Sequence, residues 1–256
     1  HAHRLFGTLV GLTTLSLALY LQRYEPNRKL RGIGWFLFLL VCVQGVLGGL
    51  RVTGRFTMSQ SHDDVAPSIA LAVVHGVFGQ IFYASLVVLA VLVSRRWKSV
   101  ASHARRELSV HSPAASLLLV AAIILQIILG AVFRHLGLAL TFHVVFAAFV
   151  LALACFVGFR AWMRDDALPV LPKYGGWLMM AATLQLLLGV LALIGVMVRR
   201  GAESPPALEV ILTTAHQTFG AVLLALAVAF ACWNVRLRKF STAENDSAAH
   251  SVLVAS

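Results

Sequence analysis

Seven long apolar stretches constrain this chain more than any other feature of its sequence. Most are close to the roughly 20 residues that a helix needs to cross a bilayer, and only a helix can satisfy its own backbone hydrogen bonds in hydrocarbon. With 59% hydrophobic and 12% charged residues, a soluble domain of 256 residues could not bury so much apolar surface. The sequence therefore predicts an all-α integral membrane protein with spans at about 5–20, 34–50, 67–93, 114–133, 137–159, 176–198 and 209–234.

The basic residues follow alternate stretches, namely the first, third, fifth and seventh. These four places hold 15 of the 21 Lys and Arg residues. By the positive-inside rule they are cytoplasmic, which places the first residue outside and the C-terminus inside. The net charge of +11 is thus explained by topology. We expect a multi-pass protein of the bacterial inner membrane, surrounded by lipid and with no nucleic-acid partner.

Histidines and glutamines repeat along the chain with nearly fixed spacing. His3 and His75 are 72 residues apart, and His143 and His216 are 73 apart. The pattern Gln-x-x-Leu-Gly occurs three times, at Gln44–Gly48, Gln126–Gly130 and Gln185–Gly189. Such a repeat predicts a duplicated unit, and two pseudo-symmetric four-helix bundles related by an axis along the membrane normal would accommodate it.

The first of the two predicted bundles is incomplete. The second half has glutamine and histidine helices in alternation, whereas no glutamine helix precedes His3. We therefore expect an N-terminally truncated chain with seven of eight helices. Its predicted parts are a first bundle lacking one helix (1–93), a cytoplasmic linker (94–112), a second bundle (113–235) and a disordered cytoplasmic tail (236–256). Its three cysteines, Cys42, Cys155 and Cys232, are interpreted as small core residues.

The four repeated histidines lie near the predicted outer ends of their spans, at similar depth. Ionisable groups inside a membrane usually mark a functional site, and two imidazoles on neighbouring helices can bind heme iron from both faces. A single such histidine would more often be a packing residue, but four in matched positions favour ligation. The sequence predicts that His3 with His75, and His143 with His216, each hold a heme iron.

Three other residue types accompany these histidines, and each has two interpretations. Glycines beside them could make room for a macrocycle or let helices pack closely; these are Gly7, Gly11, Gly76, Gly79 and Gly220. The repeated glutamines could hydrogen-bond a histidine Nδ1–H across the bundle or only join helices, and the sequence slightly favours packing. Outer arginines match a propionate carboxylate or anchor the helix ends, and the candidates for propionate contact are Arg4, Arg51 and Arg134.

At these residues the chain resembles the heme A synthase family. His3-Arg4-Leu5-Phe6-Gly7 is similar to its His-Arg-x-x-Gly segment, and Gly48-Gly49-Leu50-Arg51-Val52-Thr53 resembles its Gly-Gly-x-x-Val-Thr helix end. His75, His143 and His216 match its later helix histidines. The resemblance implies eight helices in two bundles and the oxidation of a methyl group of heme O to the formyl group of heme A.

The resemblance also implies roles and partners. His3 and His75 would bind the substrate heme O, and His143 and His216 a permanent heme b that passes electrons. Heme O synthase, cytochrome oxidase assembly factors and a second copy of the chain are possible partners. The functional glutamate of the family would fall one residue before His1, so no catalytic residue is assigned in residues 1–256, and little activity is expected of these residues alone.

Two other classes of protein compete with a synthase. A bis-His diheme cytochrome b would use the same histidines only to carry electrons, but it would place its hemes at different depths to bridge the bilayer. A transporter built on repeats would need carboxylates deep in the membrane or broken helices, and the sequence has neither feature. The matched outer depths therefore favour the synthase.

Overall fold

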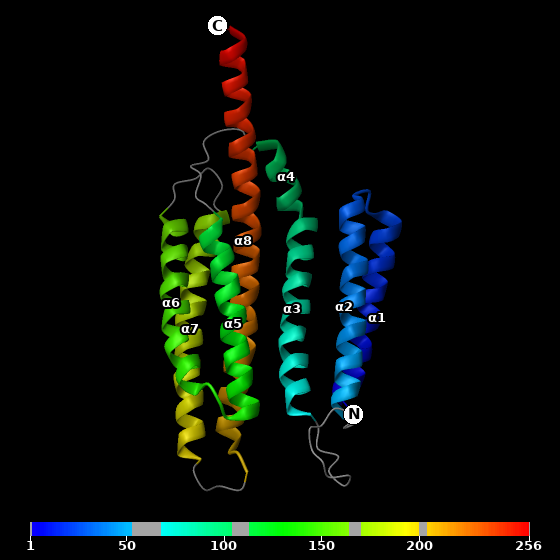
Figure 1. The fold of residues 1–256 in the computed structure, drawn as a ribbon. Helices are drawn as coiled ribbons and strands as arrows, with labels where there is room; N and C mark the ends of the chain where they lie inside the picture. The colour runs from blue at the N-terminus through cyan, green and yellow to red at the C-terminus, as the bar shows by residue number, and fades with distance from the viewer. Residues whose placement is uncertain (1, 53–67, 104–112, 164–169, 200–203, 256) are drawn as a thin grey trace. The chain divides into compact units, whose positions relative to one another are not determined.

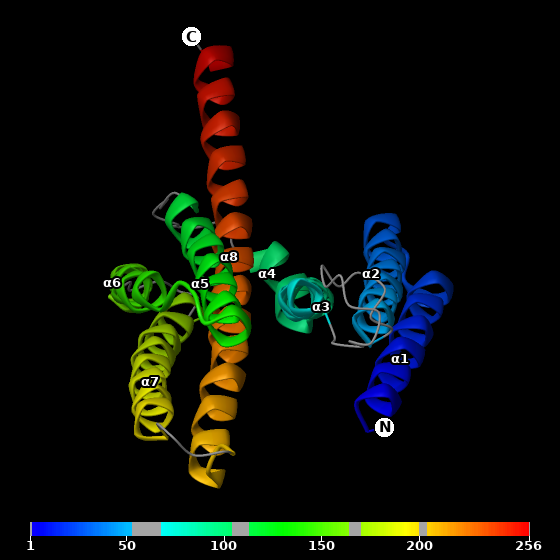
Figure 2. The same cartoon turned by 60° about the horizontal axis from the view of Figure 1, so that its bottom comes forward.

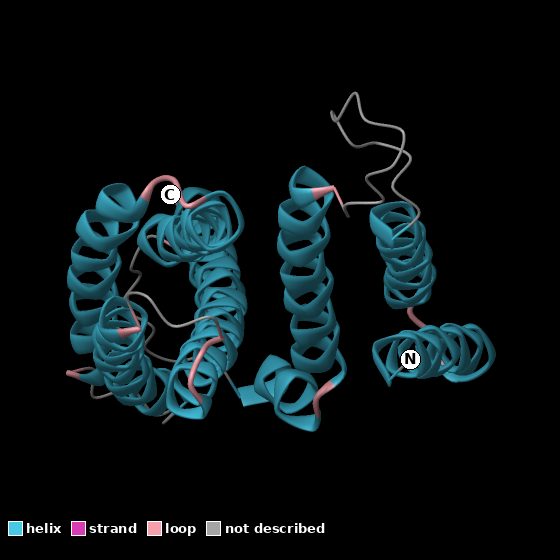
Figure 3. Ribbon diagram, turned by 90° about the horizontal axis from the view of Figure 1, so that it is seen from below, coloured by secondary structure: helices cyan, strands magenta, loops and turns pink. Residues whose placement is uncertain are grey.

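The computed structural model describes residues 2–52, 68–103, 113–163, 170–199 and 204–255, and within these ranges every regular element is a helix (Figure 3). Figure 1 gives their order along the chain. The helices are α1 (Ala2–Tyr24), α2 (Arg28–Val52), α3 (Ile69–Val93), α4 (Arg95–His103), α5 (Ala114–Leu136), α6 (Leu140–Trp162), α7 (Val170–Val198) and α8 (Ala207–Ala255).

Seven of the described helices are long and apolar enough to cross a membrane, which confirms the predicted fold class. In α8 only the segment Ala207–Leu237 qualifies. Many large apolar side chains point outward, including Phe6 at 67% and Phe142 at 73% exposure. Such surfaces are stable only when lipid covers them. The protein is an all-α, multi-pass membrane protein.

The structure has helix in two segments that the sequence assigned to a linker and a tail. The predicted linker 94–112 includes the short helix α4, and the predicted disordered tail 236–256 continues α8 as far as Ala255. Both segments are rich in residues that favour helix, such as Arg, Lys and Ala, so their polarity did not exclude helical structure.

The cysteines also differ from their interpretation as core residues. Cys42 is exposed on α2, and Cys155 and Cys232 are half-buried. In a membrane protein the lipid-facing surface accepts small apolar side chains as readily as the core does, because lipid is as apolar as the protein interior. An apolar residue therefore gives little information about which way it faces.

The chain divides into two compact units, residues 1–98 with 127–140, and residues 99–126 with 141–256. In the first unit α2 packs against both α1 and α3. The core between them contains Leu37, Leu40, Phe82 and Leu89. Gly34 lets α2 approach the backbone of Ala18 in α1, because a Cβ at Gly34 would lie 3.4 Å from the Ala18 Cα.

In the second unit small residues bring the helices close together, as is usual in membranes. Gly158 of α6 and Gly175 of α7 meet backbone to backbone, and a Cβ on either would clash with the carbonyl oxygen of the other. Helix α7 packs in turn against α8 (Figure 2). Leu224, Ala227 and Phe230 of α8 are buried.

Candidate metal centres at two histidine pairs

The structure brings His3 of α1 together with His75 of α3. Their ring centroids lie 6.0 Å apart and their planes are inclined at 86°. His3 stands in the first turn of α1 and His75 in the second turn of α3. Both helices pack against α2, so α2 sets the distance between the two imidazoles.

In the second unit the structure brings His143 of α6 together with His216 of α8 in nearly the same geometry. Their ring centroids lie 6.3 Å apart and their planes are inclined at 89°. The two units therefore repeat a pair of imidazoles as well as a sequence pattern. Each sequence-predicted pair is placed together within its own unit.

The separation of the rings fits a single metal ion between them. An imidazole nitrogen lies about 2 Å from its metal, and the ring centre roughly 1 Å behind that nitrogen, so two imidazoles on opposite sides of one ion have centres roughly 6 Å apart. The 6.0 Å and 6.3 Å separations match this value. Each pair could thus supply the two axial ligands of a heme iron.

The repeated glutamines contact the histidines directly. The side-chain amide of each glutamine donates to the backbone carbonyl oxygen of a histidine on another helix. The donor–acceptor distances are 2.8 Å for Gln44 and His75, 2.9 Å for Gln126 and His143, and 3.0 Å for Gln185 and His216. The predicted bond from a histidine Nδ1–H to a glutamine side chain is not found among the described residues, since Oε1 of all three glutamines has no hydrogen-bond partner there. The bond that joins the helices goes from the glutamine amide to the histidine backbone.

Two of the five glycines adjoin a glutamine side chain and not open space for a macrocycle. A Cβ at Gly79 would lie 3.0 Å from the Gln44 amide nitrogen, and one at Gly220 would lie 3.2 Å from that of Gln185. Both glycines make room for a glutamine. By contrast, a Cβ at Gly7, Gly11 or Gly76 would have nothing within 4 Å, so open space adjoins both helices of the first pair at these positions.

The arginines predicted to contact propionates have different surroundings. Arg4 is exposed beside His3, and Arg134 is exposed in the last turn of α5. Arg51 belongs to α2, but its side chain lies outside the described residues.

Arg199, at the C-terminal end of α7, has a carboxylate partner that sequence reasoning missed. Its Nε lies 3.2 Å from Oε2 of Glu209, which is only 7% exposed. Glu209 lies in the first turn of α8, where a negative charge is favoured by the helix dipole. The sequence signal that could have identified Glu209 is its position just after Pro205 and Pro206, at the start of an apolar helix. The pair joins the ends of α7 and α8 near His216.

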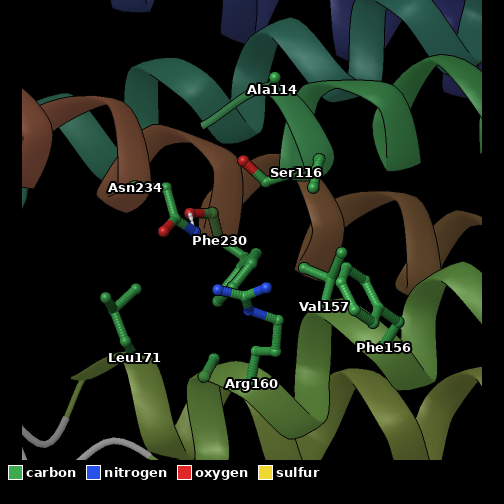
Figure 4. Close-up of a pocket in the computed structure, with 10 residues that line it drawn as sticks. Ala114, Ser116, Phe156, Val157, Arg160, Leu171, Phe230 and Asn234 are labelled. Carbon is green, nitrogen blue, oxygen red and sulfur yellow. Dashed lines mark hydrogen bonds between the residues drawn. The ribbon is translucent and has the colours of Figure 1, made fainter. Parts of the chain in front are cut away.

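The second unit also contains a cavity of about 290 Å³ at the opposite ends of its helices. Arg160 of α6 extends toward Phe230 and Asn234 of α8 (Figure 4). The guanidinium also lies over the ring of Phe156, 5.4 Å from its centroid. Since Arg160 is 17 residues after His143, about 25 Å along α6 separate the cavity from the histidine pair, and the predicted site does not include it.

The first histidine pair lies within a match to a known protein family. A family model described as cytochrome oxidase assembly protein, COX15-CtaA, matches residues 1–142. The match covers His3 and His75 and ends just before His143. No curated protein and no solved structure matches the chain. The sequence resemblance is therefore confirmed, and the chain belongs to the cytochrome oxidase assembly protein family that contains heme A synthase.

Proposed function

We propose that this protein converts heme O to heme A. His3 and His75 would hold the iron of the substrate heme, and His143 and His216 would hold a permanent heme b. The repeat of one geometry, with ring centroids 6.0 Å and 6.3 Å apart in two units, supports two heme sites. The observation that carries the synthase function is the family match over residues 1–142, which includes His3 and His75. Membership of the family supports a role in heme A synthesis for cytochrome oxidase.

The residues of each unit have separate tasks in this proposal. Oxidation of a methyl group to a formyl group with water as the oxygen source releases four electrons and four protons, so an electron acceptor outside the protein must take the electrons. Bound heme b would supply a redox centre through which they pass. The imidazoles of each pair would hold the iron of one heme. Open space at Gly7, Gly11 and Gly76 is where this chain would accommodate the edge of the substrate heme.

Arginines at the same helix ends as the histidines would contact the propionates of the substrate heme. Arg4 follows His3 directly, and it is the arginine that we propose for a propionate contact in the first unit. Arg51 and Arg134 are proposed for the same role. By the positive-inside rule these ends lie outside the inner membrane and the C-terminus lies in the cytoplasm. Heme O would then come from a heme O synthase in the same membrane.

Activity can be tested by producing heme A in a host that lacks its own synthase. The full-length protein is co-expressed with a heme O source, and the extracted hemes are identified by mass. We expect heme A with the intact protein and none with His3→Ala or His75→Ala. His135→Ala is the matched control, since His135 belongs to neither pair, and it should retain activity.

A second candidate function is a bis-His cytochrome b that only transfers electrons. The near-equal inclination of the rings, 86° and 89°, favours it because two alike sites suit two alike cofactors. The same experiment separates the two functions. A folded, heme-loaded protein that yields only hemes B and O would exclude the synthase and support the electron carrier.

A further inference from the structure

The glutamine of each repeat donates a hydrogen bond to the backbone carbonyl oxygen of a histidine. A helix carbonyl normally accepts one hydrogen bond from the amide four residues later. Its oxygen has a second lone pair, and the amide of Gln44, Gln126 or Gln185 uses it at 2.8 Å, 2.9 Å or 3.0 Å. The bond holds the backbone from which the imidazole projects, and all three repeats have it.

In the second unit the bond is reciprocal. Nδ1 of His216 lies 3.2 Å from the backbone carbonyl oxygen of Gln185, while the Gln185 side chain donates to the carbonyl oxygen of His216. A carbonyl oxygen can only accept, so this contact requires the proton on Nδ1. Nε2 of His216 then has its lone pair available for a metal.

Two glycines make room for the side chains of this contact, one for the His216 ring and one for the Gln185 amide. A Cβ at Gly189, one turn after Gln185, would lie 2.9 Å from Cε1 of the His216 ring. Gly220, one turn after His216, makes room for the Gln185 amide, since a Cβ there would lie 3.2 Å from the amide nitrogen. Gly48 and Gly79 repeat this arrangement around His75 and Gln44, at 3.1 Å and 3.0 Å.

The remaining atom of each glutamine argues against a role in packing alone. Oε1 of Gln44, Gln126 and Gln185 is buried without a hydrogen-bond partner among the described residues. A buried carbonyl oxygen without a partner is unfavourable, and a methionine or leucine would fill the same space without that cost. A glutamine is therefore favoured here only if its amide hydrogen is needed.

We propose that Gln44, Gln126 and Gln185 are positioning residues that orient the heme-binding histidines of the neighbouring helices. Each glutamine fixes one histidine through its backbone carbonyl. Around His75 and His216, the glycines one turn later also admit the two side chains. Gln44 serves the substrate pair through His75. Gln126 and Gln185 serve both histidines of the heme b pair. The proposal rests on the proposed ligation of heme by these histidines.

The test uses the purified full-length protein and the variant Gln185→Met, which keeps the size of the side chain and removes the donor. The readouts are the electron paramagnetic resonance spectrum of the low-spin heme and the rate of heme transfer to apomyoglobin. We expect a shifted spectrum and about tenfold faster heme loss, the lower end of the effect of outer-shell partners, because the Gln185 backbone carbonyl remains. Gly189→Ala should shift the spectrum in the same way by displacing the ring.

The control is Gln22→Met, which also removes a glutamine bond between two helices. Oε1 of Gln22 accepts from Nε1 of Trp35 at 3.2 Å, and neither residue contacts a histidine pair. This variant should leave the spectrum and the rate of heme loss unchanged. If Gln185→Met fails to fold, Gln126→Met gives the same comparison through His143.

The possible failures can be told apart. An intact protein that folds and holds no low-spin heme would contradict the proposed ligation itself. A heme-loaded protein in which Gln185→Met and Gln126→Met both match the intact protein in spectrum and heme loss would overturn the positioning role alone. Equal effects of Gln22→Met and Gln185→Met would also overturn it, because they would reveal a general loss of stability.

Discussion

At the level of single residues, the histidines are held from two directions. The ring of His216 rests against Gly189 and its backbone accepts from Gln185. Because imidazole is among the commonest metal ligands and needs an oriented ring to bind, this arrangement suits ligation better than solvent exposure. His143 is the partner across the 6.3 Å gap between ring centroids.

Removing either imidazole of this pair should abolish the low-spin heme b signal. We expect His143→Ala and His216→Ala each to lose the reduced-minus-oxidised absorption band, because a single axial ligand does not hold iron in the six-coordinate low-spin state. His135→Ala is the control and should retain the band. An unchanged band in both pair variants would exclude this pair as the site.

The ion pair of Arg199 and Glu209 gives a second prediction at this scale. The Glu209 side chain is 9% exposed and the Arg199 side chain 38%, so removing the arginine leaves a nearly buried charge. Arg199→Met should lower the stability of the folded protein in detergent by about 1–3 kcal/mol, less than for a fully buried pair because the guanidinium is partly solvated.

The double variant Arg199→Met with Glu209→Gln should recover part of that loss, since it removes the uncompensated charge. Thermal unfolding in detergent measures both variants. If the double variant is less stable than Arg199→Met by the full effect of Glu209→Gln alone, the two side chains do not interact, because independent sites add.

At the level of the helices, α6 and α7 meet through glycine. A Cβ at Gly175 would clash with the carbonyl oxygen of Gly158, whereas one at the adjacent Gly176 would meet only Trp162 at 3.9 Å. Gly175→Ala should therefore destabilise the second unit by about 1–3 kcal/mol, the usual effect of overpacking. Gly176→Ala is the matched control and should be neutral or slightly stabilising, because it only removes the flexibility of the unfolded chain.

Thermal unfolding in detergent also distinguishes these two helix variants. The heme content of each variant shows whether a substitution that affects the C-terminal end of α6 also disturbs His143 near its N-terminal end. Equal melting temperatures for Gly175→Ala and Gly176→Ala would mean that α6 and α7 do not approach as closely as described.

At the level of the whole molecule, the alternation of charge along the sequence predicts a membrane topology. The basic residues follow every second span, and the four histidines lie at the opposite ends of the spans. A fluorescent reporter fused after Lys239 should be active in the cytoplasm, and alkaline phosphatase at the same place should be inactive. The reverse result would place both histidine pairs on the cytoplasmic side and contradict the proposed outward-facing site.

The sequence by itself determined the spans, the helical class and the pairing of His3 with His75 and of His143 with His216. Hydropathy and repeat spacing carry this information because each depends only on residues close along the chain or on a regular period. Only the tertiary structure decided that Gly79 and Gly220 face glutamines, that Cys42 points outward and that Arg199 meets Glu209. These contacts depend on how each helix is rotated about its axis, and in apolar spans the hydrophobic pattern does not set that rotation, because lipid and protein interior are equally apolar.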